Sequence, residues 1–260
     1  MLMRIAFFSD IHANLPALEA VWEDIESQAP DFIFCLGDLV GYNIWPNEVA
    51  ALIRRKGIPT LAGNYDFGIG RSSDDCGCAY KSEAEKAWGQ ESIRYTNESV
   101  TDDTRRYLRN LPKHMQLDFE AQGDTPLRML MVHGSPRRIN EYLHIDRPAK
   151  SLSRMMAQAH AHILLFGHTH IPYHRVLHEE NGREFRFRHA VNIGSVGKPK
   201  DGDPRACYAM LEWDGLRSLK AEDGIRVQFR RVEYDVEKAA RAVEESPLPN
   251  PYADMLRAAR

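Results

Sequence analysis

The chain has 260 residues, and 43% of them are hydrophobic, which is enough for a core in one large domain or two smaller ones. Its 34 basic and 37 acidic residues give a net charge of −3, which argues against a protein that mainly binds nucleic acid or an anionic membrane. Four cysteines do not resemble a disulfide framework, no run approaches the ~18 apolar residues of a membrane helix, and the N-terminus lacks a signal-peptide pattern. We therefore expect a soluble, cytoplasmic protein.

The N-terminal part of the chain alternates strand and helix patterns. An apolar run over 3–8 predicts a first strand, and Asn14 is a suitable N-cap for the helix that follows it. A second strand is predicted over 32–36, because this run is too short for a helix and apolar enough to be buried on both faces. A helix around 49–53 then leads to a third strand candidate over 58–61. The alternation predicts an α/β fold.

The segment 68–111 interrupts this alternation. A polar loop with Cys76 and Cys78 precedes two helical stretches, 84–93 and 101–111. We interpret the segment as a helical cap over the site that the sheet carries, and a peripheral pair of surface helices explains the pattern equally well. The two cysteines are too few ligands for a zinc site, so we interpret them as loop cysteines.

After Pro112 the chain returns to strands and helices. Apolar runs over 127–132 and 163–166 predict two strands with a helix over 151–161 between them. Turn signals then separate strands that we expect to be antiparallel. These strands are 173–177, 185–193, 207–213 and 227–232, and the turn signals are Asn181-Gly182, Asp201-Gly202 and Asp214-Gly215. With a helix over 236–245 and a proline-spaced tail, the chain is predicted to be a single domain, 1–260, with 68–111 inserted as a cap.

Metal-ligating residue types follow five of the predicted strands. Loops at the carboxyl ends of strands converge in open α/β sheets, so side chains far apart in sequence meet there. Taken singly, most of these short patterns are more ordinarily a turn or a core histidine, and Gly167-His168-Thr169-His170 is equally well explained as a metal-ligand pair. Their shared placement at strand ends favours a metal site. If Asp38 is shared, the set can hold two divalent ions, and mixed oxygen and nitrogen ligands favour Mn, Fe, Zn or Co over Ca or Mg. The candidate ligands are Asp10, His12, Asp38, Asn64, His133, His168 and His170.

The ordered motifs resemble those of a known family. They are Asp10-x-His12, Gly37-Asp38, Gly63-Asn64-x-Asp66, His133-Gly134 and Gly167-His168-x-His170. This series, from about residue 4 to residue 213, is similar to the signature of the calcineurin-like metallophosphoesterases, and the segment 192–197 resembles one in small bacterial and archaeal members. The resemblance implies a four-layer α-β-β-α sandwich of two mixed sheets. It also implies that one metal ion is held by Asp10, His12, Asp38 and His170, and the other by Asp38, Asn64, His133 and His168.

This resemblance implies hydrolysis of a phosphate ester. Two ions roughly 3.5–4 Å apart can hold a bridging hydroxide for in-line attack on phosphorus and clamp the phosphate oxygens. The candidate catalytic residues are therefore Asp38, Asn64, Tyr65, Asp66 and His133. Three basic residues follow the motif blocks and are candidates to stabilise the negative charge that builds up on the phosphoryl oxygens during the reaction. A solvated surface base is nevertheless the favoured interpretation of each. They are Arg137, Arg138 and Lys198.

Tyr65 departs from the family pattern. In phosphatases of this family the residue after the asparagine is a histidine that protonates the leaving oxygen with help from the following acid, here Asp66. A phenol with a pKa near ~10 is a poor proton donor at pH 7. This favours substrates with good leaving groups, namely phosphodiesters, nucleotides or activated monoesters. Tyr65 also has two other interpretations, stacking on a base and packing of the cap.

Several rival functions share this sequence pattern. A protein-binding scaffold is suggested by the missing histidine and the large cap, but scaffolds lose ligands, whereas all seven positions are filled here. A dinucleoside polyphosphate hydrolase and a protein phosphatase are further alternatives. We expect a small phosphorylated substrate or nucleotide as the partner, and the sequence leaves the oligomeric state open. Arginines at alternate positions of one predicted strand indicate a solvated sheet face rather than a nucleic-acid site, namely Arg183, Arg186 and Arg188.

Overall fold

The strands of this computed structural model form two sheets. The structure describes residues 2–119, 127–178, 187–214 and 221–260. Within them the strands are β1 (Leu2–Phe8), β2 (Phe32–Cys35), β3 (His114–Phe119), β4 (Leu127–Val132), β5 (Ile163–Phe166), β6 (Tyr173–His178), β7 (Phe187–Asn192), β8 (Ala206–Asp214) and β9 (Ile225–Val232). One sheet has the order β2-β1-β8-β9 and the other β3-β4-β5-β7-β6. Both sheets are mixed, since each contains parallel and antiparallel pairs.

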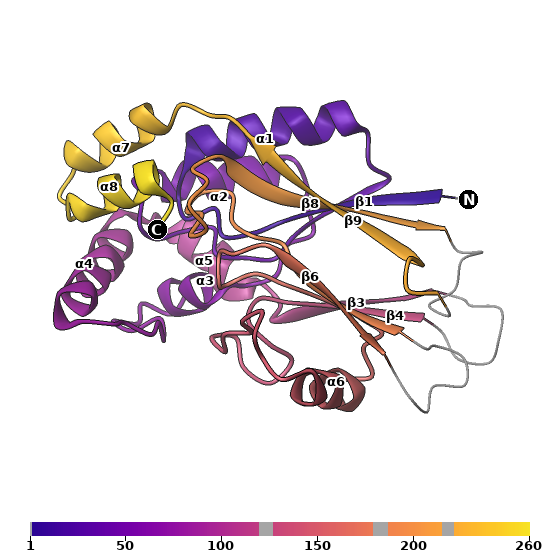
Figure 1. Cartoon of the computed structure of the whole chain (residues 1–260). Helices are drawn as coiled ribbons and strands as arrows, with labels where there is room; N and C mark the ends of the chain where they lie inside the picture. Colours follow the sequence, from indigo (N-terminus) through magenta and orange to yellow (C-terminus); the bar gives the residue numbers. More distant parts are fainter. Residues whose placement is uncertain (1, 120–126, 179–186, 215–220) are drawn as a thin grey trace.

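Helices cover the outer faces of the sheets and the end where β1 finishes (Figure 1). The described helices are α1 (Leu15–Gln28), α2 (Pro46–Arg55), α3 (Asn64–Ile69), α4 (Glu83–Ser99), α5 (Asp102–Asn110), α6 (Ala149–Gln158), α7 (Val236–Glu244) and α8 (Pro251–Ala258). The Asn14 side chain accepts a hydrogen bond from the Ala17 N–H and so caps α1 as expected. None of the helices in the described ranges is long and apolar enough to span a membrane.

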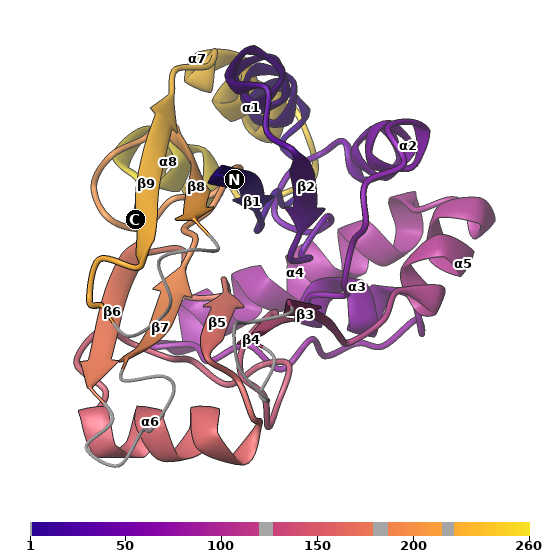
Figure 2. The same cartoon turned by 90° about the vertical axis from the view of Figure 1, so that its right-hand side faces the viewer.

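The two sheets pack face to face, which confirms the predicted four-layer sandwich (Figure 2). Alternate residues of one strand point to opposite faces. Ile5 and Phe7 of β1 therefore meet Met129 of β4 and Ile163 and Leu165 of β5 between the sheets. The intervening residues of β1 pack under α1 and α2, and those of β5 pack on α6. Strands covered on both faces read as continuous apolar runs, which is why they were visible in the sequence.

Two predicted strands differ from expectation. β2 begins exposed, with Phe32 52% accessible, because it lies at the edge of its sheet, so it is not buried on both faces along its length. Residues 58–61 make a single bridge, Cys35 to Thr60, rather than a strand. Pro59 has no N–H to donate to a ladder, which limits pairing at this position. The loop nevertheless delivers Asn64 beside the end of β2.

Further differences lie outside these runs. The strand β3 and the helices α3 and α8 were not expected, and β7 is parallel to β5 although it is antiparallel to β6. Arg188 is 8% exposed, so the expected solvated face is wrong at this residue. Its guanidinium donates to the Ala161 carbonyl. Arg183, Arg186, Asn181-Gly182, Gly215 and the start of the strand expected at 185 lie outside the described residues.

Candidate metal centre

All seven candidate ligands meet at the end of the sandwich where β1, β2, β4 and β5 finish. Two groups could each hold a metal ion, and within each group one ligand atom per residue lies within 4.8 Å of the others. The first group is Asp10, His12 and His170, and the second is Asp38, His133 and His168. Asn64 joins the second group, because its Oδ1 lies 3.1 Å from His133 Nε2. All seven side chains are nearly inaccessible.

The backbone is strained at most of these residues. Asp10, His12, Asp38, His168 and His170 have φ between 48° and 67°, in the left-handed region that non-glycine residues seldom adopt. Such conformations cost roughly 1–3 kcal/mol each and persist only where surrounding contacts hold them. Here the loops bind one another, since the Asp10 and His12 N–H groups donate to the Gly37 and Asp38 carbonyls at 2.9 Å. The sharp turns aim successive side chains at one point.

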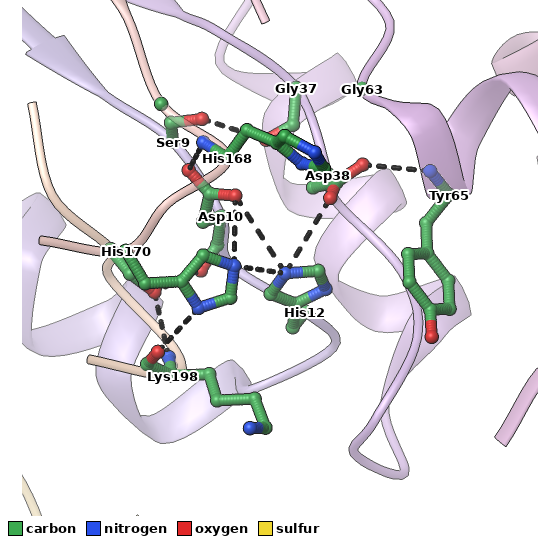
Figure 3. A network of polar contacts seen from close by, with 12 residues as sticks. Ser9, Asp10, His12, Gly37, Asp38, Gly63, Tyr65, His168, His170 and Lys198 are labelled. Carbon is green, nitrogen blue, oxygen red and sulfur yellow. Dashed lines mark hydrogen bonds and ion pairs between the residues drawn. The ribbon is translucent and has the colours of Figure 1, made fainter. Parts of the chain in front are cut away.

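Main-chain carbonyls set the tautomers of three histidines. The Nδ1 atoms of His12, His133 and His170 lie 3.0, 2.8 and 2.6 Å from the carbonyl oxygens of Val40, Leu36 and Lys198. Because a carbonyl can only accept, each Nδ1 carries the proton and donates it. In the neutral imidazoles the Nε2 lone pair then faces the centre, as metal ligation by histidine requires. Two of them, on His12 and His170, lie 3.2 Å apart (Figure 3).

Each carboxylate anchors one oxygen and presents the other. Asp10 Oδ2 accepts the His168 N–H at 3.1 Å, and Asp38 Oδ1 accepts the Tyr65 N–H at 2.9 Å. The remaining Asp38 oxygen, Oδ2, lies 3.6 Å from His12 Nε2 in the first group and 3.2 Å from His133 Nε2 in the second. Asp38 therefore faces both groups at once.

Burial keeps most of these imidazoles neutral. It lowers the pKa of His168 and of His170 to about 3, and it also lowers the pKa of His12. Burial alone would lower the pKa of His133 as well, but the Asp38 and Asp10 carboxylates raise it to about 10. Neutral imidazoles are ligand-competent, and a divalent cation would take the place of the His133 proton.

The donor set fits divalent cations. Asp10 Oδ1 and His168 Nε2 are buried without a hydrogen-bond partner, and both face the cluster. Buried carboxylate oxygens and imidazole nitrogens are normally paired, so orphaned ones need a partner that the protein itself does not supply. A cation between the side chains would satisfy these atoms and the opposed Nε2 lone pairs of His12 and His170. The mixture of carboxylate, imidazole and amide donors is typical of borderline transition metals.

The cysteine loop orients Asn64. The Asn64 Nδ2 donates to the Cys76 carbonyl at 2.8 Å and lies 3.4 Å from Cys78 Sγ. With the amide nitrogen bound on this side, Oδ1 faces His133. Both cysteines are free, and neither belongs to a metal-binding group among the described residues. The sequence interpretation as loop cysteines missed this positioning contact.

Tyr65 and Asp66 lie next to the centre but contact it differently. The Tyr65 ring packs edge-on against the His12 ring, with the centroids 5.5 Å apart, and its hydroxyl points away from the carboxylates (Figure 3). Burial raises the pKa of Tyr65 well above its usual value. The Asp66 carboxylate accepts the Leu39 and Gly63 N–H groups at 2.9 and 3.0 Å, which ties α3 to the loop after β2. Burial and the adjacent Asp38 carboxylate raise the pKa of Asp66 to about 7.

The basic residues near the motifs have different surroundings. Arg137 is exposed and pairs with Glu141, as a surface base does. Lys198 is instead 4% exposed and lies beside His170. Two further neighbours of the centre were missed in the sequence. The Lys200 N–H donates to the His170 carbonyl at 3.2 Å, and the Tyr142 ring stacks on the His168 ring at 4.0 Å. Neither residue belongs to a recognisable motif, so no local signal could have marked them.

A comparison with protein families decides the classification. The model of the calcineurin-like phosphoesterase superfamily domain matches residues 3–215, which contain every candidate ligand. The chain belongs to this superfamily. Together with the geometry, membership establishes a metal-dependent phosphoesterase, a hydrolase with two candidate metal-binding groups.

Relatives of this phosphoesterase cover nearly the whole chain. The uncharacterised protein MJ0912 of Methanocaldococcus jannaschii is 31% identical over an alignment of 257 positions, which covers 94% of this chain and 93% of that protein. Phosphodiesterase YfcE of Escherichia coli is 26% identical over 222 residues, 85% and 94% of the two chains. The structure of a metallophosphoesterase from Sphaerobacter thermophilus matches with a TM-score of 0.71 and 30% identity over 100% of both chains.

Proposed function

We propose that this phosphoesterase hydrolyses phosphodiesters, or nucleotides and monoesters with similarly good leaving groups, at two divalent transition-metal ions. The observation that carries the proposal is the position of Asp38 Oδ2, 3.6 Å from His12 Nε2 and 3.2 Å from His133 Nε2. One carboxylate oxygen that faces both ligand groups is suited to bridge two ions. The phosphodiesterase activity in the name of the YfcE relative supports the choice of ester.

Each candidate residue has a proposed role. Asp38 would contribute a ligand to both ions, and Asn64 and His133 would complete the second site, with His133 bound in its neutral form. When bound, the two ions would supply a nucleophile from water at neutral pH and neutralise charge on the phosphoryl oxygens. The first ion would be held by Asp10, His12, Asp38 and His170, and the second by Asp38, Asn64, His133 and His168. We assign Asp66 a positioning role, because both of its oxygens are occupied by backbone N–H groups.

The direct test uses metal-free and reconstituted protein. Protein loaded in turn with Mn, Fe, Zn or Co should hydrolyse bis(4-nitrophenyl) phosphate, and chelation should abolish turnover and lower the melting temperature, because the buried carboxylates and imidazoles lose their partners. Release of 4-nitrophenol and thermal melts measure the two effects. Unchanged turnover after verified metal removal would overturn the proposal.

Tyr65→Phe should leave catalysis nearly intact. The hydroxyl points away from the carboxylates, so we expect kcat/KM for bis(4-nitrophenyl) phosphate to stay within about twofold of wild type with an unchanged pH profile, whereas loss of a general acid costs about 10²–10⁴-fold. Tyr65→Leu should instead lower the melting temperature, since it removes buried ring contacts with His12 and Tyr42. A 100-fold loss in the phenylalanine variant alone would assign proton donation to Tyr65.

We further propose that 1–260 is one domain with 68–111 as its cap. Trp88 and Tyr95 of α4 pack against a cluster from α7 and α8, so the segment is joined to the C-terminal helices. Its Cys76–Cys78 loop lies beside Asn64. We also propose a cytoplasmic location, where the four free cysteines would stay reduced.

A further inference from the structure

A small cavity adjoins the metal centre on the side of the C-terminal helices. It encloses about 180 Å³, and its walls include Tyr42, Tyr142, Tyr252, Lys198 and Lys200. The Tyr42 ring lies 4.8 Å from the His12 ring, and the Tyr142 ring stacks on the His168 ring at 4.0 Å. Two residues of the cavity wall therefore contact candidate ligands, one from each metal group. Since whole-ligand pockets enclose about 300–1,000 Å³, the cavity is sized for part of a substrate.

Two lysines in this cavity lack acidic partners. Lys198 is 4% exposed, and its ammonium lies over the Tyr42 and Tyr252 rings, 5.0 and 5.8 Å from their centroids, and 3.6 Å from Met255 Sδ. Neither Lys198 nor Lys200 forms an ion pair with a carboxylate in the described part of the chain. The wall contains one acidic side chain, Glu85, and its carboxylate accepts the Lys81 N–H at 2.8 Å.

The main chain holds both lysines against a candidate ligand. The Lys198 carbonyl accepts the proton of His170 Nδ1 at 2.6 Å, and the Lys200 N–H donates to the His170 carbonyl at 3.2 Å. Burying an ammonium without an anion is costly, and tyrosine faces compensate only part of that cost. By contrast, the partly buried Arg230 is paired with Asp24 at 2.6 Å. These two side chains would therefore stabilise an anion from outside the chain that bound next to the metal centre.

We propose that Lys198 and Lys200 form a subsite for a second phosphate group of the substrate, on the side of the ester that is not cleaved. The inference rests on the proposed function, because the first phosphate must be held at the metal ions. The subsite would make the enzyme prefer some phosphate esters over others. Substrates with a second phosphate within reach of the cavity bind and react better than singly charged ones. The reason is that the two lysine side chains interact favourably with the negative charge of that second phosphate.

Two chromogenic diesters with the same leaving group test the subsite. One is thymidine 5′-(4-nitrophenyl phosphate), and the other is the same compound with a 3′-phosphate. In metal-loaded wild type, kcat/KM should be at least about 10-fold higher for the phosphorylated diester, the effect expected of one charge-assisted contact. Lys200→Gln should bring the ratio close to one, because it lowers kcat/KM mainly for the diester that carries the 3′-phosphate. Lys200→Arg should preserve the ratio, and Lys198→Met should reduce it.

A matched control separates this effect from general electrostatics. Lys150 is exposed at the start of α6, so Lys150→Gln removes the same charge elsewhere and should keep the wild-type ratio. Equal kcat/KM for the two diesters in wild type, or an equal loss on both in Lys200→Gln, would overturn the subsite and leave the proposed function standing. Hydrolysis of neither diester would overturn the proposed function and this inference with it.

Discussion

Asp38→Asn is expected to lower kcat for bis(4-nitrophenyl) phosphate by about 1000-fold or more while the protein remains folded. Removing a residue that merely supports a metal ligand costs about 10–100-fold, and Asp38 faces both ligand groups, so the loss should be larger. The amide keeps an oxygen that can accept the Tyr65 N–H, which now bonds Asp38 Oδ1 at 2.9 Å, so the local backbone should survive. Steady-state kinetics and metal content per chain measure the outcome.

The control for this variant is a carboxylate far from the centre. Asp103 lies in the first turn of α5 with its side chain 75% exposed. Its ion pair with Arg106 is exposed to solvent, and such pairs contribute little to the free energy of unfolding. Asp103→Asn should therefore retain full activity and metal content. If Asp38→Asn still bound two ions and kept a tenth of the wild-type kcat, Asp38 would not be the bridge.

Gly63→Ala is expected to damage both stability and metal binding. A Cβ at this position would lie 2.0 Å from Asp38 Oδ1 and 2.3 Å from the Asp38 nitrogen, so the Asp38 loop must move. Overpacking of this kind costs about 3 kcal/mol. For a chain of this size, that corresponds to a fall of about 6–12 °C in melting temperature. The displacement should also weaken metal affinity, because it shifts the carboxylate that faces both groups.

Gly57→Ala is the matched glycine control. Gly57 has φ of +64° and nothing within 4 Å of an added Cβ, so only the left-handed backbone is penalised, by about 1–2 kcal/mol. It should melt higher than Gly63→Ala and bind metal like wild type. Equal melting temperatures and equal metal affinities in the two variants would show that the close approach of Gly63 to Asp38 is unimportant. Calorimetric metal titration supplies the second readout.

The parts of the fold that could be predicted from the sequence are those whose hydrophobic pattern is strong within a single short segment. β5 is apolar at all four positions, and both of its faces are covered, so its run was visible without tertiary information. β3 was missed although His114 to Phe119 alternates exposed and half-buried positions, because period-two patterning with modest hydrophobicity is a weak signal at a sheet edge. α8 was missed because Pro251 suggested a tail, whereas proline is favoured in the first turn of a helix.

The identity of the candidate ligands was determined by the sequence alone. A strand followed by a sharp turn places the next polar side chain at the strand's carboxyl end. Four strands and the extended loop 58–61 follow this pattern, and they identified Asp10, His12, Asp38 and their partners without reference to distant contacts. The tertiary structure decided how these atoms face one another. The position of Asp38 Oδ2 between His12 and His133 depends on how the two sheets stack through Ile5 and Met129.

The side chains that surround the candidate ligands were likewise brought together only by the tertiary structure. The direction of the Tyr65 hydroxyl, the contact of Cys76 with Asn64 and the meeting of Lys198 with Tyr42 and Tyr252 join segments from distant parts of the chain. Such contacts are set by side-chain packing rather than by local periodicity, so they leave no mark in a short stretch of sequence. Ligand chemistry is therefore readable from motifs, whereas substrate preference depends on the walls that the folded chain assembles around them.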